Sequence, residues 1–316
     1  MPPSILQSKV IDVSSWKLDD QFGSYPEGAR EKSAFFPPDY LEFDFINTQK
    51  RYLFKRSRRM YPDQFWAEIV AYQVGCLLGV EVPPAFASYN SDDNTCGALI
   101  EWFYIDNEVF YVQGGNYMQN AIPDFERKLG AKHNYHTISA ISRVLNRAKI
   151  LIVDWQVHWG QAFLFDALIG NSDRHQDNWG LLWFPDKSKG TFKINYSPLF
   201  DNGTALGHEL FEHKISHWDD KRYSSYINNG YHHMKWNLDD LSRVGHMDMV
   251  KRVTQDNLVL KAHLANMLNN FSMDELHNTL STLQGLELPI KFSEGRSNLM
   301  FKLISMRHNL LKSVLS

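Results

Sequence analysis

The sequence predicts an α+β protein of two lobes, a β-rich first lobe with one main helix and a mostly helical second lobe. Two observations predict it. Short runs typical of strands fill much of residues 40–103, whereas beyond about residue 105 apolar residues recur three and four apart. We therefore expect lobes over residues 1–104 and 105–316. A chain of 316 residues, 43% of them hydrophobic, is long enough to bury one or two cores.

The first lobe is expected to contain three strands and a helix. Residues 40–46 alternate apolar with polar side chains, and residues 51–55 form a second β-prone run, so the two predict a hairpin. Apolar spacing over residues 63–79 predicts a helix begun at Asp63 and stopped at a glycine. A buried strand is expected at 98–103 after a turn rich in Asp and Asn.

The second lobe is expected to be dominated by helices. Apolar spacing predicts one long helix over 147–168, or two helices broken near Gly160, with Gly170 as the stop. Residues 181–194 have the pattern of a hairpin, and residues 296–314 that of a final amphipathic helix.

Charge and composition exclude several classes of protein. The net charge of −3 argues against a protein that mainly grips nucleic acid, although residues 50–59 form one basic cluster. The longest apolar runs are too short for a membrane span, and the first residues lack the pattern of a signal peptide. Cys76 and Cys96 are too few for a disulfide framework. We expect a cytoplasmic protein, with a secreted effector left open.

Two polar loops of the second lobe carry the functional signal. Asp173 is followed five residues later by Asn178, and Asp201 begins an Asp-Asn-Gly turn. Phosphoryl transfer needs one carboxylate beside the attacking hydroxyl, an Asn on a metal ion and a second Asp that joins metal to phosphates. The order and spacing predict a kinase that uses ATP and Mg²⁺, with Asp173 orienting the acceptor and Asn178 and Asp201 binding metal. Each loop alone would more often be a simple turn.

The first lobe contains the lysine and the glutamate that a kinase site also needs. Lys55 ends a predicted strand, where a kinase lysine grips the α- and β-phosphates, and Glu68 lies on the next helix as its partner. The connecting segment at 101–106 is expected to contact nucleotide through Glu101 and Phe103.

Residues 23–32 could fold over phosphates with their backbone N–H groups, or could be an ordinary surface loop. The candidate nucleotide contacts there are Gly23, Ser24, Gly28, Arg30 and Lys32.

These motifs together resemble one family. Gly28-Ala29-Arg30-Glu31-Lys32-Ser33-Ala34 is similar to the phosphate loop of HipA-like serine/threonine kinases, and Asn171-Ser172-Asp173-Arg174-His175-Gln176-Asp177-Asn178 to their catalytic loop. Lys55, Glu68 and Asp201 fall where that family has its lysine, helix glutamate and metal aspartate. The resemblance implies a bilobal, protein-kinase-like fold and transfer of phosphate from ATP to a protein Ser or Thr.

The resemblance also carries expectations about regulation. HipA itself has an additional amino-terminal subdomain that this chain is too short to contain, so the compact members are closer; these include toxins of toxin–antitoxin pairs and effector kinases. An antitoxin or other regulatory partner is therefore expected. The serine that the family autophosphorylates falls nearest Tyr25, with Ser24 adjacent. His175 and Arg174 would support the loop or neutralise phosphate charge, and His175 is also expected to contact the nucleotide.

Other functions compete with a protein kinase. The Asp173-to-Asn178 motif with Asp201-Asn202-Gly203 is also similar to type II phosphatidylinositol 4-kinases within the phosphatidylinositol 3/4-kinase-like group, so a lipid or small-molecule kinase is the first alternative. A nucleotide-binding pseudokinase is the next, which retention of the polar groups disfavours. Zinc binding by five histidines is disfavoured, because the sequence contains no His-Glu-x-x-His motif. These are His208, His213, His217, His232 and His233.

Overall fold

The computed structural model describes residues 4–20, 31–106, 108–186, 188 and 190–316, and the chain divides into two compact units. The first comprises residues 1–103, 202–217 and 272–302, and the second residues 104–201, 218–271 and 303–316. The predicted α+β class is confirmed, because the first unit is built on a sheet and the second is mostly helical. The assignment of lobes to residues 1–104 and 105–316 stays a prediction.

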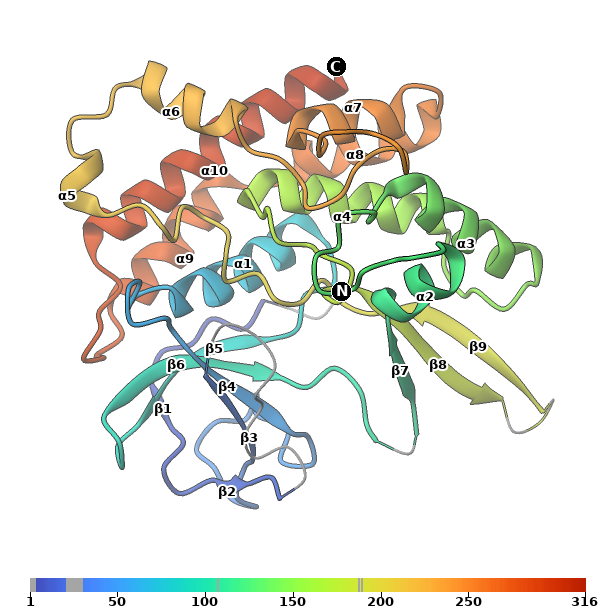
Figure 1. Cartoon of the computed structure of the whole chain (residues 1–316). Coiled ribbons are helices and arrows are strands. Elements are labelled where there is room, and N and C mark those ends of the chain that lie inside the picture. The colour runs from blue at the N-terminus through green and yellow to red at the C-terminus, as the bar shows by residue number, and fades with distance from the viewer. Residues whose placement is uncertain (1–3, 21–30, 107, 187, 189) are drawn as a thin grey trace. The chain divides into compact units, whose positions relative to one another are not determined.

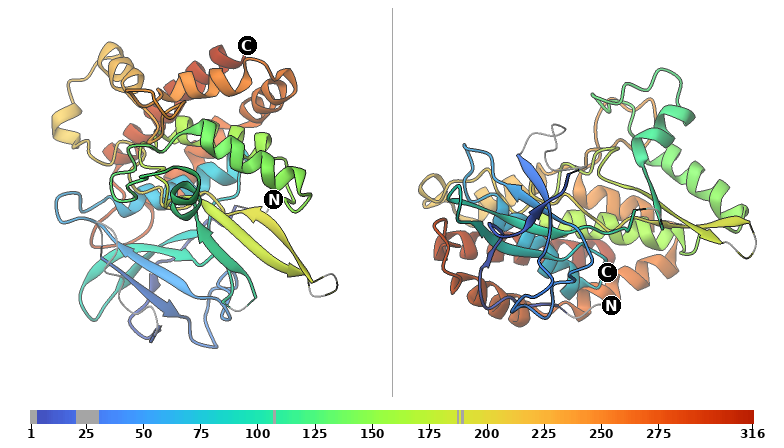
Figure 2. Two further views of the ribbon diagram at one scale, coloured as in Figure 1. Left: turned by 45° about the vertical axis from the view of Figure 1, so that its right-hand side comes forward. Right: turned by 90° about the horizontal axis from the view of Figure 1, so that it is seen from below.

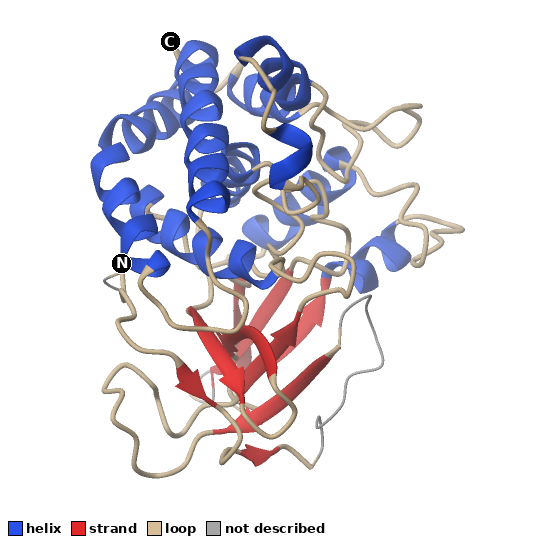
Figure 3. Cartoon of the chain, turned by 90° about the vertical axis from the view of Figure 1, so that its left-hand side faces the viewer, coloured by secondary structure: helices blue, strands red, loops and turns tan. Residues whose placement is uncertain are grey.

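The first unit contains one curled six-stranded sheet (Figures 1 and 3). Its order is β1-β5-β6-β4-β3-β2; β1 and β5 run parallel, and every other neighbouring pair is antiparallel. The strands are β1 (Ile11–Asp12), β2 (Lys17–Leu18), β3 (Lys32–Phe36), β4 (Tyr52–Arg56), β5 (Ala85–Asn90) and β6 (Thr95–Glu101).

The predicted hairpin between residues 40–46 and 51–55 is wrong. Residues 51–55 do contribute β4, but both edges of β4 are occupied, by β3 on one side and β6 on the other. Residues 40–46 therefore have no free edge of β4 to pair with, and they form turns. Their apolar side chains still pack on the sheet, since the ring of Phe45 lies 4.8 Å from that of Phe86.

Helix α1 (Phe65–Leu78) confirms the helix predicted for residues 63–79. It is buried along nearly its whole length and packs against β5, β6 and α9 (Met273–Gln284). Gly79 ends it with φ = 84°, a left-handed conformation that glycine adopts without a steric penalty. The indole N–H of Trp66 donates to the Ile290 carbonyl at 3.2 Å, which joins α1 to the chain before α10 (Glu294–Leu315).

Residues 202–217, which include α5 (Glu212–Ile215), are held within the first unit by hydrogen bonds from Arg296. Arg296 is buried at the start of α10 and donates to the carbonyls of Gly207 at 2.9 Å and Leu210 at 2.8 Å. It also donates to the Asp63 carboxylate at 2.9 Å. One guanidinium therefore orders the chain that follows the Asp-Asn-Gly turn.

The second unit is arranged around α4 (Trp155–Ile169), which packs against α3 (Tyr135–Arg147), α7 (His246–Thr254) and α8 (Leu258–Asn270). Gly160 does not break α4, but the predicted start at residue 147 is wrong, because α4 begins only at Trp155. A Cβ there would lie 2.8 Å from Leu260 Cδ1, so this glycine lets α8 approach. The predicted stop is confirmed, because Gly170 caps α4 with φ = 69°.

A three-stranded antiparallel sheet completes the second unit, in the order β7-β8-β9 (Figure 2). The strands are β7 (Phe110–Gln113), β8 (Gly180–Asp186) and β9 (Thr191–Tyr196), and β8–β9 is the hairpin predicted at 181–194. The unit also contains α2 (Gly114–Ala121) and α6 (Asp220–Asn228). Within the described part of the chain, no helix combines the length and apolar content that crossing a membrane requires.

Candidate catalytic site

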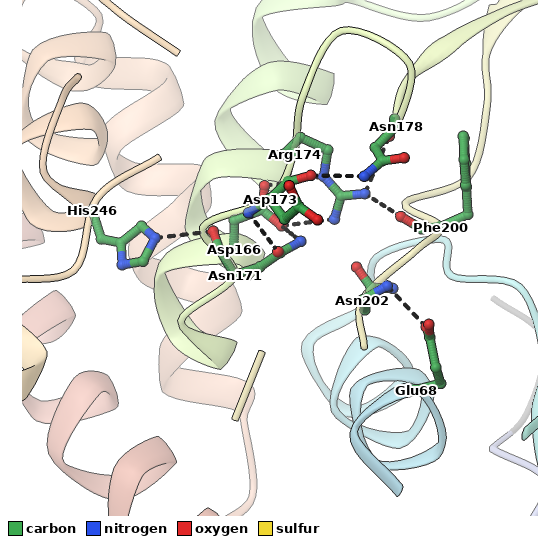
Figure 4. Close-up of polar contacts among 9 residues, drawn as sticks. All are labelled: Glu68, Asp166, Asn171, Asp173, Arg174, Asn178, Phe200, Asn202 and His246. Carbon is green, nitrogen blue, oxygen red and sulfur yellow. Dashed lines mark hydrogen bonds and ion pairs between the residues drawn. The ribbon is translucent and has the colours of Figure 1, made fainter. Parts of the chain in front are cut away.

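A buried ion pair organises the loop that follows α4. Asp166, on the last turn of α4, and Arg174 are each no more than 1% exposed. The carboxylate accepts two bonds from the guanidinium, from Nη2 at 2.7 Å and Nε at 3.1 Å. Two parallel bonds of this kind fix orientation as well as distance. The loop is therefore anchored to the helix that delivers it (Figure 4).

The backbone of Asp173 is held from both sides. Its N–H donates to Asn171 Oδ1 at 3.0 Å, and its carbonyl accepts from Asn178 Nδ2 at 2.7 Å. Because Nδ2 is used in this way, Oδ1 is the atom that Asn178 can offer to a metal ion. The Asp173 side chain is half-buried. The five-residue spacing predicted from the sequence thus corresponds to a closed turn joining the two residues.

Arg174 also connects this loop to the segment that leads to Asp201. Its Nη1 donates to the carbonyl of Phe200 and, at 3.3 Å, to that of Asn178. Asp201 has φ = 58°, the left-handed region that Asp and Asn tolerate better than most residues. Arg174 therefore supports the loop: it binds backbone and a carboxylate within the second unit.

A second set of contacts secures the outer part of the loop. His175 Nδ1 accepts from the Asp177 N–H at 3.1 Å, so the ring that was predicted to contact nucleotide is used within the loop through this atom. The Asp177 carboxylate accepts from Arg127 Nε at 2.8 Å. On the opposite side, His246 Nε2 lies 3.0 Å from the Asn171 carbonyl.

In the first unit, Glu68 bridges two partners. Its Oε1 lies 2.7 Å from Lys55 Nζ, and its Oε2 accepts the N–H of Asn202 at 2.8 Å. Lys55 and Glu68 are both buried. The predicted pair of lysine and helix glutamate is therefore formed, and it also holds the residue that directly follows Asp201 in the chain (Figure 4).

Lys32 is the cross-strand neighbour of Lys55. The two residues face each other in the ladder of β3 and β4, so their side chains leave the sheet on the same side. Like charges in this arrangement repel each other. The role of Lys32 as a phosphate contact stays a prediction.

Glu101 and Phe103 lie at the end of the first unit. The Glu101 carboxylate accepts from Lys50 Nζ and, at 3.2 Å, from the hydroxyl of Tyr52. Burial, followed by the charge of Glu101, raises the pKa of Tyr52. Phe103 is half-buried. Four further candidates, Gly23, Ser24, Gly28 and Arg30, lie outside the described residues, as does Tyr25.

Comparison with known proteins decides the family. The model of the HipA-like C-terminal domain matches residues 25–264, well over half of the chain. The chain belongs to the HipA-like C-terminal domain family. A search of curated proteins found no match.

Solved structures share the fold of this HipA-like chain. It is similar to the proinflammatory kinase CtkA of Helicobacter pylori, with a TM-score of 0.68 and 18% identity over 97% of this chain and 98% of that one. A weaker likeness, TM-score 0.46 and 12% identity, is to HipA of Shewanella oneidensis, solved with HipB and operator DNA; it covers 94% of this chain and 65% of HipA. The predicted protein-kinase-like fold is confirmed. Family and fold together support a phosphotransferase.

Sequence reasoning missed several residues that hold this HipA-like loop together. Asp166 is the one acidic side chain in α4, a helix that is otherwise almost wholly apolar over its last turns, and that contrast could have identified it. Arg127 and His246 gave no such signal, because they lie far from the loop in sequence and no local sequence pattern marks them. Within the described residues, no group of three or more His, Cys, Asp or Glu side chains is arranged to hold a metal ion.

Two substitutions of Glu68 distinguish its contact with Lys55 from its contact with the Asn202 N–H. Glu68→Ala removes both, whereas Glu68→Gln keeps a carbonyl oxygen for the Asn202 N–H and loses only the charge beside Lys55. Leaving one partner of a buried pair unmatched costs about 3–5 kcal/mol. We expect Lys55→Met to impair ATP turnover most, Glu68→Ala less and Glu68→Gln least.

Urea unfolding and the KM for ATP, measured on all three variants, check this order. Equal KM values in wild type and Lys55→Met would contradict the assignment of Lys55 to the phosphates.

Proposed function

We propose that this HipA-like chain is an ATP-dependent kinase that transfers the γ-phosphate to a Ser or Thr hydroxyl of a protein. Asp173 would orient the acceptor hydroxyl, and Asn178 and Asp201 would bind Mg²⁺ through oxygen atoms. Lys55 and Lys32 would bind phosphate oxygens, with Glu68 positioning Lys55. Glu101 and Phe103 would contact the nucleotide. An antitoxin or another regulatory partner remains part of this proposal.

One observation carries the proposal: Arg174 ties three segments of the second unit together. Its guanidinium binds the end of α4 through Asp166, the loop through the Asn178 carbonyl, and the carbonyl of Phe200 next to Asp201. Two simple surface turns would not need a shared buried cation. A site for metal and phosphate would, because its ligands must be held in fixed positions before substrate binds.

The first unit adds independent support. Lys32 and Lys55 face each other across β3 and β4, and Lys55 Nζ lies 2.7 Å from Glu68 Oε1. Both lysine side chains therefore leave the sheet on the same side. A nucleotide phosphate has the right charge and oxygen acceptors for that position.

The proposal predicts metal-dependent nucleotide binding that requires Asp201. Asp201→Asn keeps a residue that tolerates φ = 58° and removes the carboxylate, so the fold should persist. We expect Mg²⁺-dependent ATP affinity, measured by calorimetry, to fall by about tenfold or more, or 1.4 kcal/mol. Asp186→Asn, the same change at the end of β8, should bind Mg-ATP like the wild type.

The acceptor is tested by transfer of radiolabelled γ-phosphate to protein and to phosphoinositide vesicles in parallel. Label on Ser or Thr of a protein supports the proposal. Label on the lipid alone identifies a lipid kinase and overturns it. Mg-ATP binding without transfer to either acceptor would favour a nucleotide-binding module, and absence of Mg-ATP binding would refute the whole assignment.

A further inference from the structure

A buried histidine contacts the backbone of the loop that contains Asp173. His246 is the first residue of α7 and is 2% exposed. Its Nε2 lies 3.0 Å from the Asn171 carbonyl, and its Nδ1 lies 3.2 Å from Arg307 Nη1. Arg307, buried on α10, also donates to the Ala167 carbonyl at 3.1 Å. All of these residues belong to the second unit.

The partners of His246 determine which ring nitrogen carries the proton. A guanidinium has donors only, so Nδ1 must accept from Arg307. In a neutral ring the proton is then on Nε2, which donates to the Asn171 carbonyl. Burial, and next the neighbouring His232 and Arg307, lower the pKa of His246 well below its ordinary value. The ring is therefore neutral near pH 7, in a single tautomer.

Asn171 connects His246 to the backbone of Asp173. Asn171 is fully buried, and its four polar groups each have a partner in the second unit; the backbone N–H donates to the Asp166 carbonyl at 2.9 Å. The carbonyl accepts from His246, Nδ2 donates to Asp166 at 3.2 Å, and Oδ1 accepts the Asp173 N–H at 3.0 Å. Since the contacts with His246 and Asp166 fix the orientation of Asn171, they also fix where its Oδ1 holds Asp173.

We propose that His246 is a positioning residue for Asp173, acting through Asn171, with Arg307 selecting the tautomer that makes the contact possible. This inference rests on the proposed role of Asp173 in phosphoryl transfer. Gly170 belongs to the same arrangement: a Cβ at this position would lie 2.6 Å from Arg307 Nη2, so the guanidinium packs directly on the backbone before the loop.

Three variants test the proposal. His246→Leu removes both polar atoms of the ring, whereas His246→Gln retains one donor and one acceptor. His308→Leu is the matched control, because His308 is also buried and lies 2.9 Å through Nε2 from a backbone carbonyl, that of Leu268, away from the loop.

We expect His246→Leu to lower kcat about 10- to 100-fold, as loss of an orienting partner typically does, with little change in the KM for ATP. His246→Gln should recover most of the loss, and His308→Leu should keep the wild-type kcat. A wild-type kcat in folded His246→Leu, or a loss that Gln does not recover, would overturn the proposal.

Two further measurements do not depend on activity. Hydrogen exchange at the Asp173 amide should become faster in His246→Leu and stay unchanged in His308→Leu. The ¹⁵N NMR signals of the wild-type histidine should show the Nε2–H tautomer, a result that needs no variant to fold. Unchanged exchange, or the opposite tautomer, refutes the positioning role of His246 even if the wild type transfers phosphate. Conversely, a wild type that transfers no phosphate refutes the proposed function, while hydrogen exchange and the tautomer still test whether His246 positions Asp173.

Discussion

Asp173→Asn is expected to reduce phosphoryl transfer by about 10²- to 10⁴-fold, the range of a positioned acid–base group, while ATP binding stays near wild type. The substitution removes the charge that is proposed to orient the acceptor hydroxyl and changes little else. The contacts of Asp173 with Asn171 and Asn178 run through its backbone N–H and carbonyl, which Asn also has. Single-turnover transfer with saturating Mg-ATP is the direct measurement.

Asp154→Asn is the matched control for this experiment. Asp154 caps the start of α4 by accepting from the Gln156 N–H at 2.8 Å, and Asn caps helices about as well as Asp does. We expect this control to retain full activity. If Asp173→Asn were equally active, the carboxylate would have no part in the transfer, and the catalytic assignment would be wrong.

Arg174→Met is expected to lower the free energy of unfolding by about 3–5 kcal/mol and to abolish transfer. The stability loss arises because Asp166 would keep a buried charge without its partner. The activity loss arises because the carbonyls of Phe200 and Asn178 lose the donor that orders them. Urea unfolding at pH 7, followed by tryptophan fluorescence, measures the first effect.

A double-mutant cycle separates the pair from its surroundings. Asp166→Leu with Arg174→Met removes both charges, so the double variant should be more stable than either single variant. Activity should stay lost, because the guanidinium bonds to backbone are not restored. Additive stability losses would show that the pair contributes nothing beyond its separate side chains.

Local signals in the sequence predicted some elements of the second unit. Gly170 was visible as a helix stop, and the hairpin at 181–194 was visible from two apolar runs around a polar turn. The failure at residues 40–46 has a different origin. Alternating side chains show that a segment covers an apolar surface, but strand pairing depends on which sheet edges remain open, and β4 had none.

The candidate site was predicted only in part, for a similar reason. Asp173, Asn178 and Asp201 follow each other at short spacing, so the pattern is local. The supporting residues are distant in sequence: His246 lies 75 residues from Asn171, and Arg307 lies 61 residues beyond His246. A neutral buried histidine has no sequence signature, because its role depends on the two partners that fix its proton.

The left-handed backbone of Asp201 restricts how this position can change over evolutionary time. At φ = 58°, most side chains strain the chain, whereas Asn and Gly fit nearly without cost. Substitutions that remove the carboxylate while keeping the turn are therefore almost limited to those two. If Asp201 binds metal as proposed, a single replacement by Asn or Gly would give a stable family member without catalysis.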